Sequence, residues 1–319
     1  MADFKKLIDT ITKAVTNFEK VIPDIQKGML DEVLLLIKQL NLNGDKIKVQ
    51  AANIRILDRI KAKLQRIILS PEYVRAVKEY VSTFNDVVKL QHDYFSSVES
   101  SFSPPKFSKE IKNQAIESVV KNLTESGLGA NITDKVYDLL RTAITSGGGY
   151  SSLNGQLRDF IINSSENDGH LLKYTRQITT DALNQFSGQY TQLISSDLGY
   201  EWYRYSGSNI VTTRPWCLAC RERKWFHISE IPAAIKGDFE EFGKYDGKIY
   251  DKTGLPSGMI PGTDVSNFMV NRGGYNCGHQ WRPVSESLVP EDIKRRVHST
   301  PEYESWARLN GKKVKENAE

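Results

Sequence analysis

The chain has 319 residues, enough for about two domains, and its 39% hydrophobic and 26% charged residues exclude a wholly disordered protein. Its net charge of +4 is expected to be spread thinly and would not by itself hold nucleic acid, since non-specific binding needs several phosphate contacts concentrated on one surface. The longest aliphatic run is residues 33–37, so we expect neither a membrane span nor a signal peptide.

The first hundred residues have the apolar spacing of helices. Apolar side chains recur three and four positions apart over residues 4–25, 30–40, 54–67 and 74–98, which predicts a coiled-coil-like helix bundle for residues 1–99. Pro23 predicts a kink or a restart, and Ser70-Pro71 predicts a helix start. Gln91 occupies the one polar position of the fourth series, in which Val74 and Val81 are expected core residues. Because these stripes exceed what one small domain buries, we expect this region to be an assembly surface.

Residues 100–107 contain two prolines and several serines, so we expect a linker there. Residues 108–199 are predicted to be helical and to end in a long amphipathic helix over 171–196, closed by Gly199. Three glycines at 147–149 precede one of these helices. Glycine amides at a helix start can cradle an anion, but without a following lysine the pattern favours a connector.

The last third of the chain differs from the rest in composition. Residues 200–289 are rich in glycine, proline and aromatic residues, which predicts a small, loop-rich α+β module. Tyr200–Tyr205 and Ile210–Thr212 are expected to form a hairpin around the turn 207–209. Residues 290–319 are expected to be a C-terminal tail with one short helix. The predicted fold class is therefore α+β, with a mainly helical N-terminal region.

All three cysteines lie in this last third, and their odd number argues against a disulfide framework and for a reducing compartment. Cys217 and Cys220 are three residues apart after Pro215, so we expect them on one face at the start of a helix that Thr213 caps. Cys277 and His279 follow Gly273-Gly274, which allow a tight backbone, so the two side chains can point at one centre. Three thiolates and an imidazole are a common tetrahedral set for structural zinc. The predicted zinc ligands are Cys217, Cys220, Cys277 and His279; the alternative is a metal-free cluster of buried thiols.

Residues 174–284 resemble the C-terminal domain of the Mu F-like (MuF) head-morphogenesis proteins of bacteriophages. The resemblance begins with a long helix carrying an arginine and polar residues, and continues with a tryptophan-containing strand and a threonine-arginine segment. It ends with a lysine-aromatic strand and a closing asparagine-cysteine motif followed by an aromatic residue and Pro-Val. The residues concerned are Arg176, Thr180, Asp181, Asn184, Gln185, Thr212, Thr213, Arg214, Lys224–Ile231 and Asn276–Val284. The chain departs from the family pattern in two places. It has Cys217 and Cys220 in the segment where the family often has histidine, and it has Gly278-His279 in the closing motif where the family often has a second cysteine or Cys-Arg-His.

The resemblance implies a minor head protein of the virion, made in the cytoplasm of the host bacterium. It would be oligomeric within the particle and would contact the portal protein, the major capsid protein or both. It implies no enzymatic activity and no membrane association, and it leaves room for a weak contact with packaged DNA.

Two alternatives remain open. The first is a metal-dependent nuclease or toxin that uses His227, Glu230 and His279; a closed three-cysteine, one-histidine set argues against it, because hydrolysis needs an open coordination position. The second is an internal DNA-contacting virion protein, suggested by the basic and aromatic mixture of residues 214–225. The nearby acidic residues 238–241 favour intramolecular pairing over such a contact.

Overall fold

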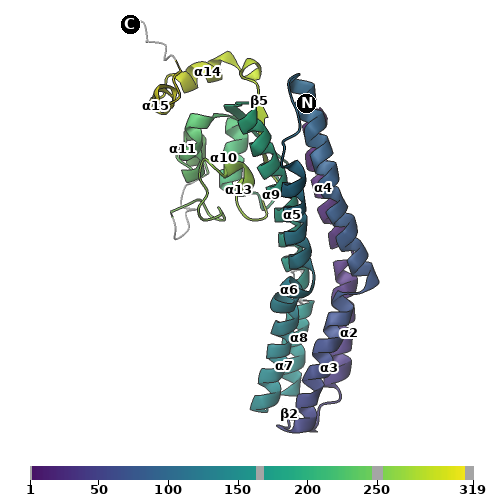
Figure 1. The fold of residues 1–319 in the computed structure, drawn as a ribbon. Coiled ribbons are helices and arrows are strands. Elements are labelled where there is room, and N and C mark those ends of the chain that lie inside the picture. The colour runs from purple at the N-terminus through teal and green to yellow at the C-terminus, as the bar shows by residue number, and fades with distance from the viewer. Residues whose placement is uncertain (1, 163–168, 246–253, 313–319) are drawn as a thin grey trace. The chain divides into compact units, whose positions relative to one another are not determined.

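The computed structural model describes residues 2–162, 169–245 and 254–312, and it is mainly helical with a few short antiparallel strands (Figure 1). The predicted α+β class is confirmed. The chain divides into two compact units built from separated segments: unit 1 comprises residues 1–8, 88–109 and 183–319, and unit 2 comprises residues 9–87 and 110–182. The boundaries expected at residues 99 and 199 therefore both fall inside unit 1. None of the described helices is both long and apolar enough to span a bilayer.

Unit 2 consists of helices joined by short turns, and four of its helices continue into unit 1. Its elements are α1 (Ala2–Glu19), α2 (Ile22–Ile37), β1 (Leu42–Asn43), β2 (Lys46–Ile47), α3 (Ala51–Ile68), α4 (Pro71–Val98), α5 (Ser108–Leu123), α6 (Glu125–Leu128), a π-helical turn (Gly129–Thr133), α7 (Asp134–Ser146), α8 (Tyr150–Ile161) and α9 (His170–Asp197). The predicted restart at Pro23 is confirmed, since α1 ends at Glu19 and α2 begins at Ile22. The predicted cap is confirmed too: the Ser70 hydroxyl accepts the Tyr73 amide at 3.3 Å.

The buried line of α4 differs from the predicted one. Val74 and Val81 are only half-buried, whereas Tyr73 and Tyr80 are buried in their place. A buried phenol needs a hydrogen-bond acceptor. The Tyr73 hydroxyl donates to the Leu123 carbonyl at 2.9 Å and the Tyr80 hydroxyl to the Thr179 carbonyl at 2.6 Å. These acceptors come from distant segments, so apolar periodicity gave no sign of them.

The helix start after the three glycines is already occupied by a carboxylate. Asp45, in the turn between β1 and β2, accepts hydrogen bonds from the Ser151 amide at 2.9 Å and the Ser151 hydroxyl at 2.7 Å. Its own carbonyl accepts the Tyr150 amide at 2.7 Å. The hydrogen bonds from the hydroxyl and the amide of Ser151 lower the pKa of Asp45. The protein thus supplies its own anion where a bound phosphate would lie.

Unit 1 contains a three-stranded antiparallel sheet with several short helices. Its strands are β3 (Trp202–Ser206), β4 (Trp225–His227) and β5 (Gln280–Val284), in the order β4-β3-β5. Its helices, besides parts of α1, α4, α5 and α9, are α10 (Pro215–Arg223), α11 (Ile231–Lys236), α12 (Glu240–Gly243), α13 (Phe268–Asn271), α14 (Glu291–His298) and α15 (Pro301–Leu309). The predicted hairpin is wrong. Residues 210–212 form no strand, and β3 pairs with strands that lie far away in the sequence.

Helices α4 and α9 meet within unit 1 through a buried amide. Gln91 donates to the carbonyl and to the hydroxyl of Ser187, both at 3.0 Å, and its side-chain oxygen accepts the Thr191 hydroxyl at 3.2 Å. This explains the single polar position in the α4 series, because all three residues are buried and hydrogen-bonded. At Gly188 the α9 backbone passes so close to Met269 that an added Cβ would lie 2.0 Å from the Met269 carbonyl oxygen.

The C-terminal residues form two helices rather than the expected one. Val297 in α14 and Ala307 in α15 are fully buried, and the Trp306 ring lies 4.5 Å from the ring of His227. Most of the expected tail is thus helical, and it packs against the rest of unit 1 through these few side chains. Residues 313–319 lie outside the described residues.

Candidate metal site

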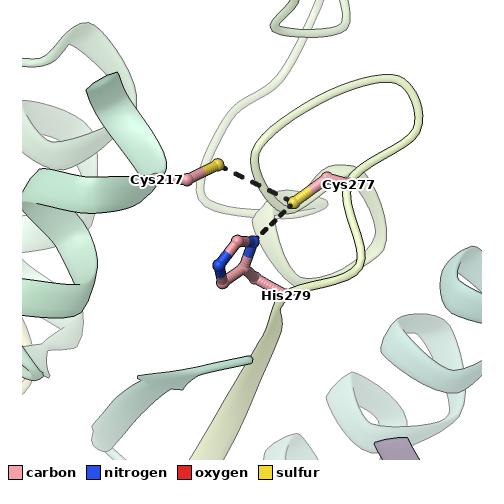
Figure 2. Close-up of side chains that lie close together, drawn as sticks. All are labelled: Cys217, Cys277 and His279. Atoms are coloured by element: carbon pink, nitrogen blue, oxygen red, sulfur yellow. Dashed lines mark hydrogen bonds between the residues drawn. The ribbon is translucent and has the colours of Figure 1, made fainter. Parts of the chain in front are cut away.

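The structure brings together three of the four predicted ligands. Cys217 lies on α10, while Cys277 and His279 lie in the segment that leads into β5, and Figure 2 shows the three side chains converging. The Cys217 and Cys277 sulfurs are 3.9 Å apart, and the Cys277 sulfur is 3.6 Å from Nδ1 of His279. All the ligand atoms lie within 4.8 Å of one another, and the three residues are buried. This Cys217–Cys277–His279 group could hold a metal ion.

Cys220 is outside this group, although it is fully buried on the same helix. Three residues along a helix move a side chain by about 4.5 Å along the axis and by about 60° around it. The Cys220 side chain therefore leaves the helix in a different direction from the Cys217 side chain. Desolvation, the largest cause, raises the pKa of the Cys220 thiol.

The helix that carries Cys217 begins as predicted, but its cap differs. Pro215 occupies the first turn, and the N-cap residue is Arg214, whose side chain makes no capping bond. The Thr213 hydroxyl instead accepts the Ile210 amide at 2.7 Å and closes the preceding loop. The Arg214 guanidinium donates to the carbonyls of Gly273, at 2.6 Å, and Tyr275. Arg214 thus ties α10 to the segment that carries Cys277.

Glycine is required at position 273 because the backbone passes directly against the sulfurs. A Cβ there would lie 2.4 Å from the Cys217 sulfur, 2.9 Å from the Cys277 sulfur and 2.9 Å from the Tyr205 hydroxyl. Gly274 has φ +96° and would place a Cβ 1.7 Å from the Gly258 carbonyl oxygen. The tight backbone predicted for the glycine pair is confirmed.

Tyr205 and Asn209 also belong to the site, although the sequence pattern predicted neither as a site residue. The Tyr205 hydroxyl lies 3.4 Å from the Cys217 sulfur and 3.5 Å from the Cys277 sulfur, and its ring stacks on His279 with an interplanar angle of 11°. Oδ1 of Asn209 lies 3.4 Å from Nε2 of His279. The only sequence signal for Tyr205 was its alternation within a strand. Asn209 was predicted only as a turn residue.

The thiols of Cys217 and Cys277 differ in the direction of their pKa shifts. The hydrogen bond between the two cysteines lowers the pKa of Cys277 and raises that of Cys217, and His279 and Arg272 lower the pKa of Cys277 further. Arg272 is buried and donates from Nε to the Cys277 carbonyl at 3.1 Å. Desolvation raises the pKa of Tyr205, so its hydroxyl keeps its proton. Cys277 is therefore the first of the group to become a thiolate, the form that binds metals.

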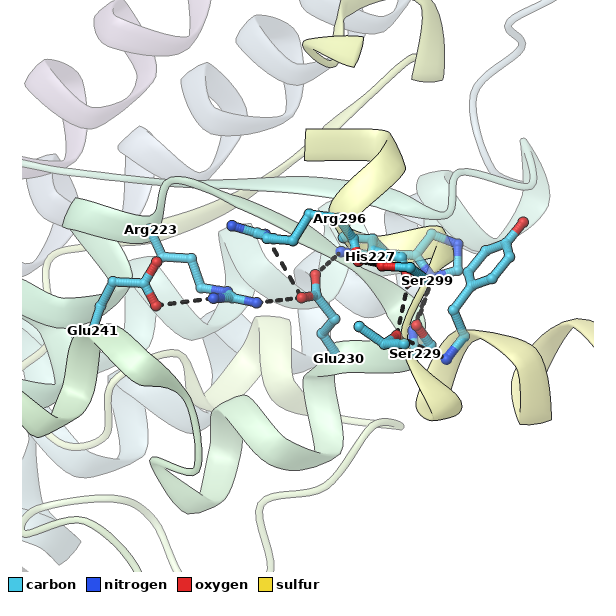
Figure 3. Close-up of polar contacts among 10 residues, drawn as sticks. Arg223, His227, Ser229, Glu230, Glu241, Arg296 and Ser299 are labelled. Carbon is cyan, nitrogen blue, oxygen red and sulfur yellow. Dashed lines mark hydrogen bonds and ion pairs between the residues drawn. The ribbon is translucent and has the colours of Figure 1, made fainter. Parts of the chain in front are cut away.

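His227 and Glu230, the other residues of the nuclease alternative, lie in a separate polar cluster (Figure 3). Nδ1 of His227 accepts the Ser229 amide at 3.2 Å, and a Glu230 carboxylate oxygen accepts the His227 amide at 3.0 Å, so the two residues cap a short 3₁₀ helix. Arg223 bridges Glu230 and Glu241. Neither His227 nor Glu230 is part of the metal-competent group found among the described residues.

Comparison with protein-family models, with curated proteins and with solved structures gave no match. The resemblance to the MuF-like family therefore depends on this chain's own residues.

The close approach at Gly273 gives a matched pair of substitutions. Gly273→Ala should lower the free energy of unfolding by about 2 kcal/mol or more, because the added methyl overlaps two buried sulfurs. Gly278→Ala meets no atom within 4 Å and should change it by less than about 0.5 kcal/mol. Urea denaturation measures both. Equal effects of the two substitutions would contradict the crowded geometry at position 273.

The buried His227 makes stability depend on pH. Burial, with smaller contributions from His298 and Lys312, lowers its pKa to about 3, so between pH 6.5 and 3 the unfolded chain binds a proton that the folded chain does not. The stability contributed by His227 is complete above pH 6.5 and is lost as the pH falls, by about 1 kcal/mol per pH unit. His227→Asn should flatten the dependence between pH 6 and 4, measured by urea denaturation at each pH. Parallel curves for the two proteins would contradict it.

Proposed function

We propose that this protein is a MuF-like minor head protein of a bacteriophage, and that a zinc ion bound by its cysteines and His279 is a structural cross-link of unit 1. The observation that carries the zinc proposal is the geometry of the Cys217–Cys277–His279 group. On tetrahedral zinc, two thiolate sulfurs are about 3.8 Å apart, and a sulfur and an imidazole nitrogen about 3.6 Å apart. The measured separations are 3.9 Å and 3.6 Å.

The surroundings of the group support a structural ion. A metal-bound histidine usually donates its second ring N–H to an oxygen, and Asn209 places Oδ1 next to Nε2 of His279. The three ligand residues are at most 5% exposed. A catalytic metal must keep a position open to substrate. The burial therefore favours a cross-link over the nuclease alternative.

We propose Cys220 as the fourth ligand because structural zinc sites are almost always four-coordinate and Cys220 is the remaining thiol of α10. Cys220 is fully buried one helical turn after Cys217, and a change in its side-chain rotamer would be needed for it to reach the ion.

The proposal of a head protein is supported by how the family-like segments are arranged. The tryptophan-containing strand β3 lies at the centre of the unit 1 sheet and pairs with the lysine-aromatic strand β4 on one side and the closing-motif strand β5 on the other. The threonine-arginine segment leads into α10, which carries Cys217. Segments separated by tens of residues thus form one small domain around the proposed zinc.

Metal content tests the zinc proposal. Protein purified without chelator should contain about one zinc per chain, and removal of the ion should lower the melting temperature, because bound metal stabilises only the folded state. Cys217→Ser and Cys277→Ser should lose the zinc, Cys220→Ser should bind it more weakly, and the control His298→Gln should retain it. Metal-free protein whose melting temperature is indifferent to chelator would contradict the proposal.

Composition of purified particles tests the head assignment. Quantitative mass spectrometry of gradient-purified virions from the phage that encodes the chain should find it in a small, fixed number of copies relative to the portal protein. A deletion of residues 1–99 is a poor probe of its contacts, because it removes Gln91 and Tyr94, which bond to Ser187 and Pro283 in unit 1. Detection in infected-cell lysate with none in purified virions would refute the assignment.

A further inference from the structure

The positive charge of the chain is concentrated in one segment. Residues 38–66 contain eight lysines and arginines and two aspartates, for a net charge of +6, so the other 290 residues carry a net charge of −2. This segment begins directly after α2 and covers the β1–β2 hairpin and most of α3, all in unit 2. Figure 1 shows α2, β2 and α3 as neighbouring elements.

The arginines of α3 form a series along its exposed side. Arg55, Arg59 and Arg66 are exposed, and their spacing of four and seven residues keeps them within one stripe over about 16 Å of helix. Arg59 donates to the Gln39 side-chain oxygen at 2.6 Å, which places the stripe beside the end of α2. Exposed Lys38, the C-cap residue of α2, and exposed Lys48 after the hairpin add charge at the same end of the helix pair.

The carboxylates of this region form no ion pair with these cations. Asp45 caps α8 through Ser151, and Glu32 pairs with Lys63 at 3.2 Å. Within the described residues, no carboxylate lies within ion-pair distance of Lys38, Lys48, Arg55, Arg59 or Arg66. Asp58 is the one other acid of the segment. Five exposed cations thus face solvent from one helix pair and its hairpin.

The basic residues near the aromatic C-terminal segments are used differently. Arg214 donates to two backbone carbonyls, and Arg223 pairs with Glu230 and Glu241. These two guanidiniums hold unit 1 together and are not available to an external anion. If the protein contacts a polyanion, the charge distribution places the contact on unit 2.

We propose that the surface formed by Lys38, Lys48, Arg55, Arg59 and Arg66 binds the phosphate backbone of duplex DNA. A line of guanidiniums matches a line of phosphates, since each can donate two hydrogen bonds to one phosphate. DNA carries a charge about every 1.7 Å, so a 16 Å stripe meets several phosphates. Such contacts do not read sequence. The inference does not depend on zinc or on the head assignment.

The test measures binding of the full-length protein to a 30-base-pair DNA duplex by fluorescence anisotropy over a series of salt concentrations. Simultaneous Arg55→Gln, Arg59→Gln and Arg66→Gln should weaken binding on the order of a hundredfold near 0.1 M salt. It should also reduce the slope of log affinity against log salt by roughly 2 to 3, about 0.9 per lost phosphate contact. The matched control removes three exposed unit 2 lysines elsewhere, with Lys13→Gln, Lys27→Gln and Lys121→Gln, and should bind nearly as the unchanged protein does.

Leu35 distinguishes DNA from an acidic protein as the partner. Its side chain is 56% exposed on α2, between Glu32, which contacts Lys63, and Gln39, which contacts Arg59. An amphipathic acidic peptide bound to this surface would cover Leu35, whereas a phosphate backbone would not. Leu35→Ser should leave the affinity for DNA unchanged. The proposal is overturned if the unchanged protein fails to bind the duplex at low salt, if the arginine and lysine triple variants weaken binding equally, or if Leu35→Ser weakens it as much as the arginine variant. Circular dichroism of each variant shows that it is folded.

Discussion

The close contact of the Gly273 backbone with the sulfurs of Cys217 and Cys277 is the constraint on which the rest of unit 1 depends. It sets the distance between α10 and the segment before β5, two parts of the chain that are about sixty residues apart. Arg214 bonds the same segment to the start of α10, and Tyr205 covers the sulfurs from β3. Together these contacts hold the two backbone segments at that separation.

The sheet and the site stabilise each other because they share residues. Tyr205 lies opposite Trp281 in the β3–β5 ladder, and His279 immediately precedes β5. The rings of Trp216, Phe226 and Phe268 surround Trp281 at centroid distances of 6.4, 5.0 and 5.2 Å. A sheet of only three short strands has little backbone pairing of its own, so packing of this aromatic core carries much of the stability, and the proposed zinc would add a cross-link at its edge.

The two units use buried polar groups for different purposes. In unit 2 the buried tyrosines of α4 satisfy backbone groups of distant helices, and the arginines of α3 stay in solvent. In unit 1 the charged groups turn inward: Arg272, Arg223 and Glu230 are all largely buried and hydrogen-bonded. A buried charge costs free energy unless it is paired, so these groups fix one arrangement of unit 1 and exclude looser ones.

The sequence by itself determined the helices, their starts at Ile22 and Pro71, the α+β class, and three of the residues that gather at the candidate metal site. These features depend on local spacing, on proline and on glycine, all of which act over a few residues. Only the tertiary structure decided that β3 pairs with β4 and β5 rather than with residues 210–212, that Tyr205 and Asn209 belong to the site, and that the Cys220 sulfur lies outside the group. Strand pairing and ligand direction depend on contacts between residues far apart in the chain, and the periodicity of one segment carries no information about which distant segment will lie against it.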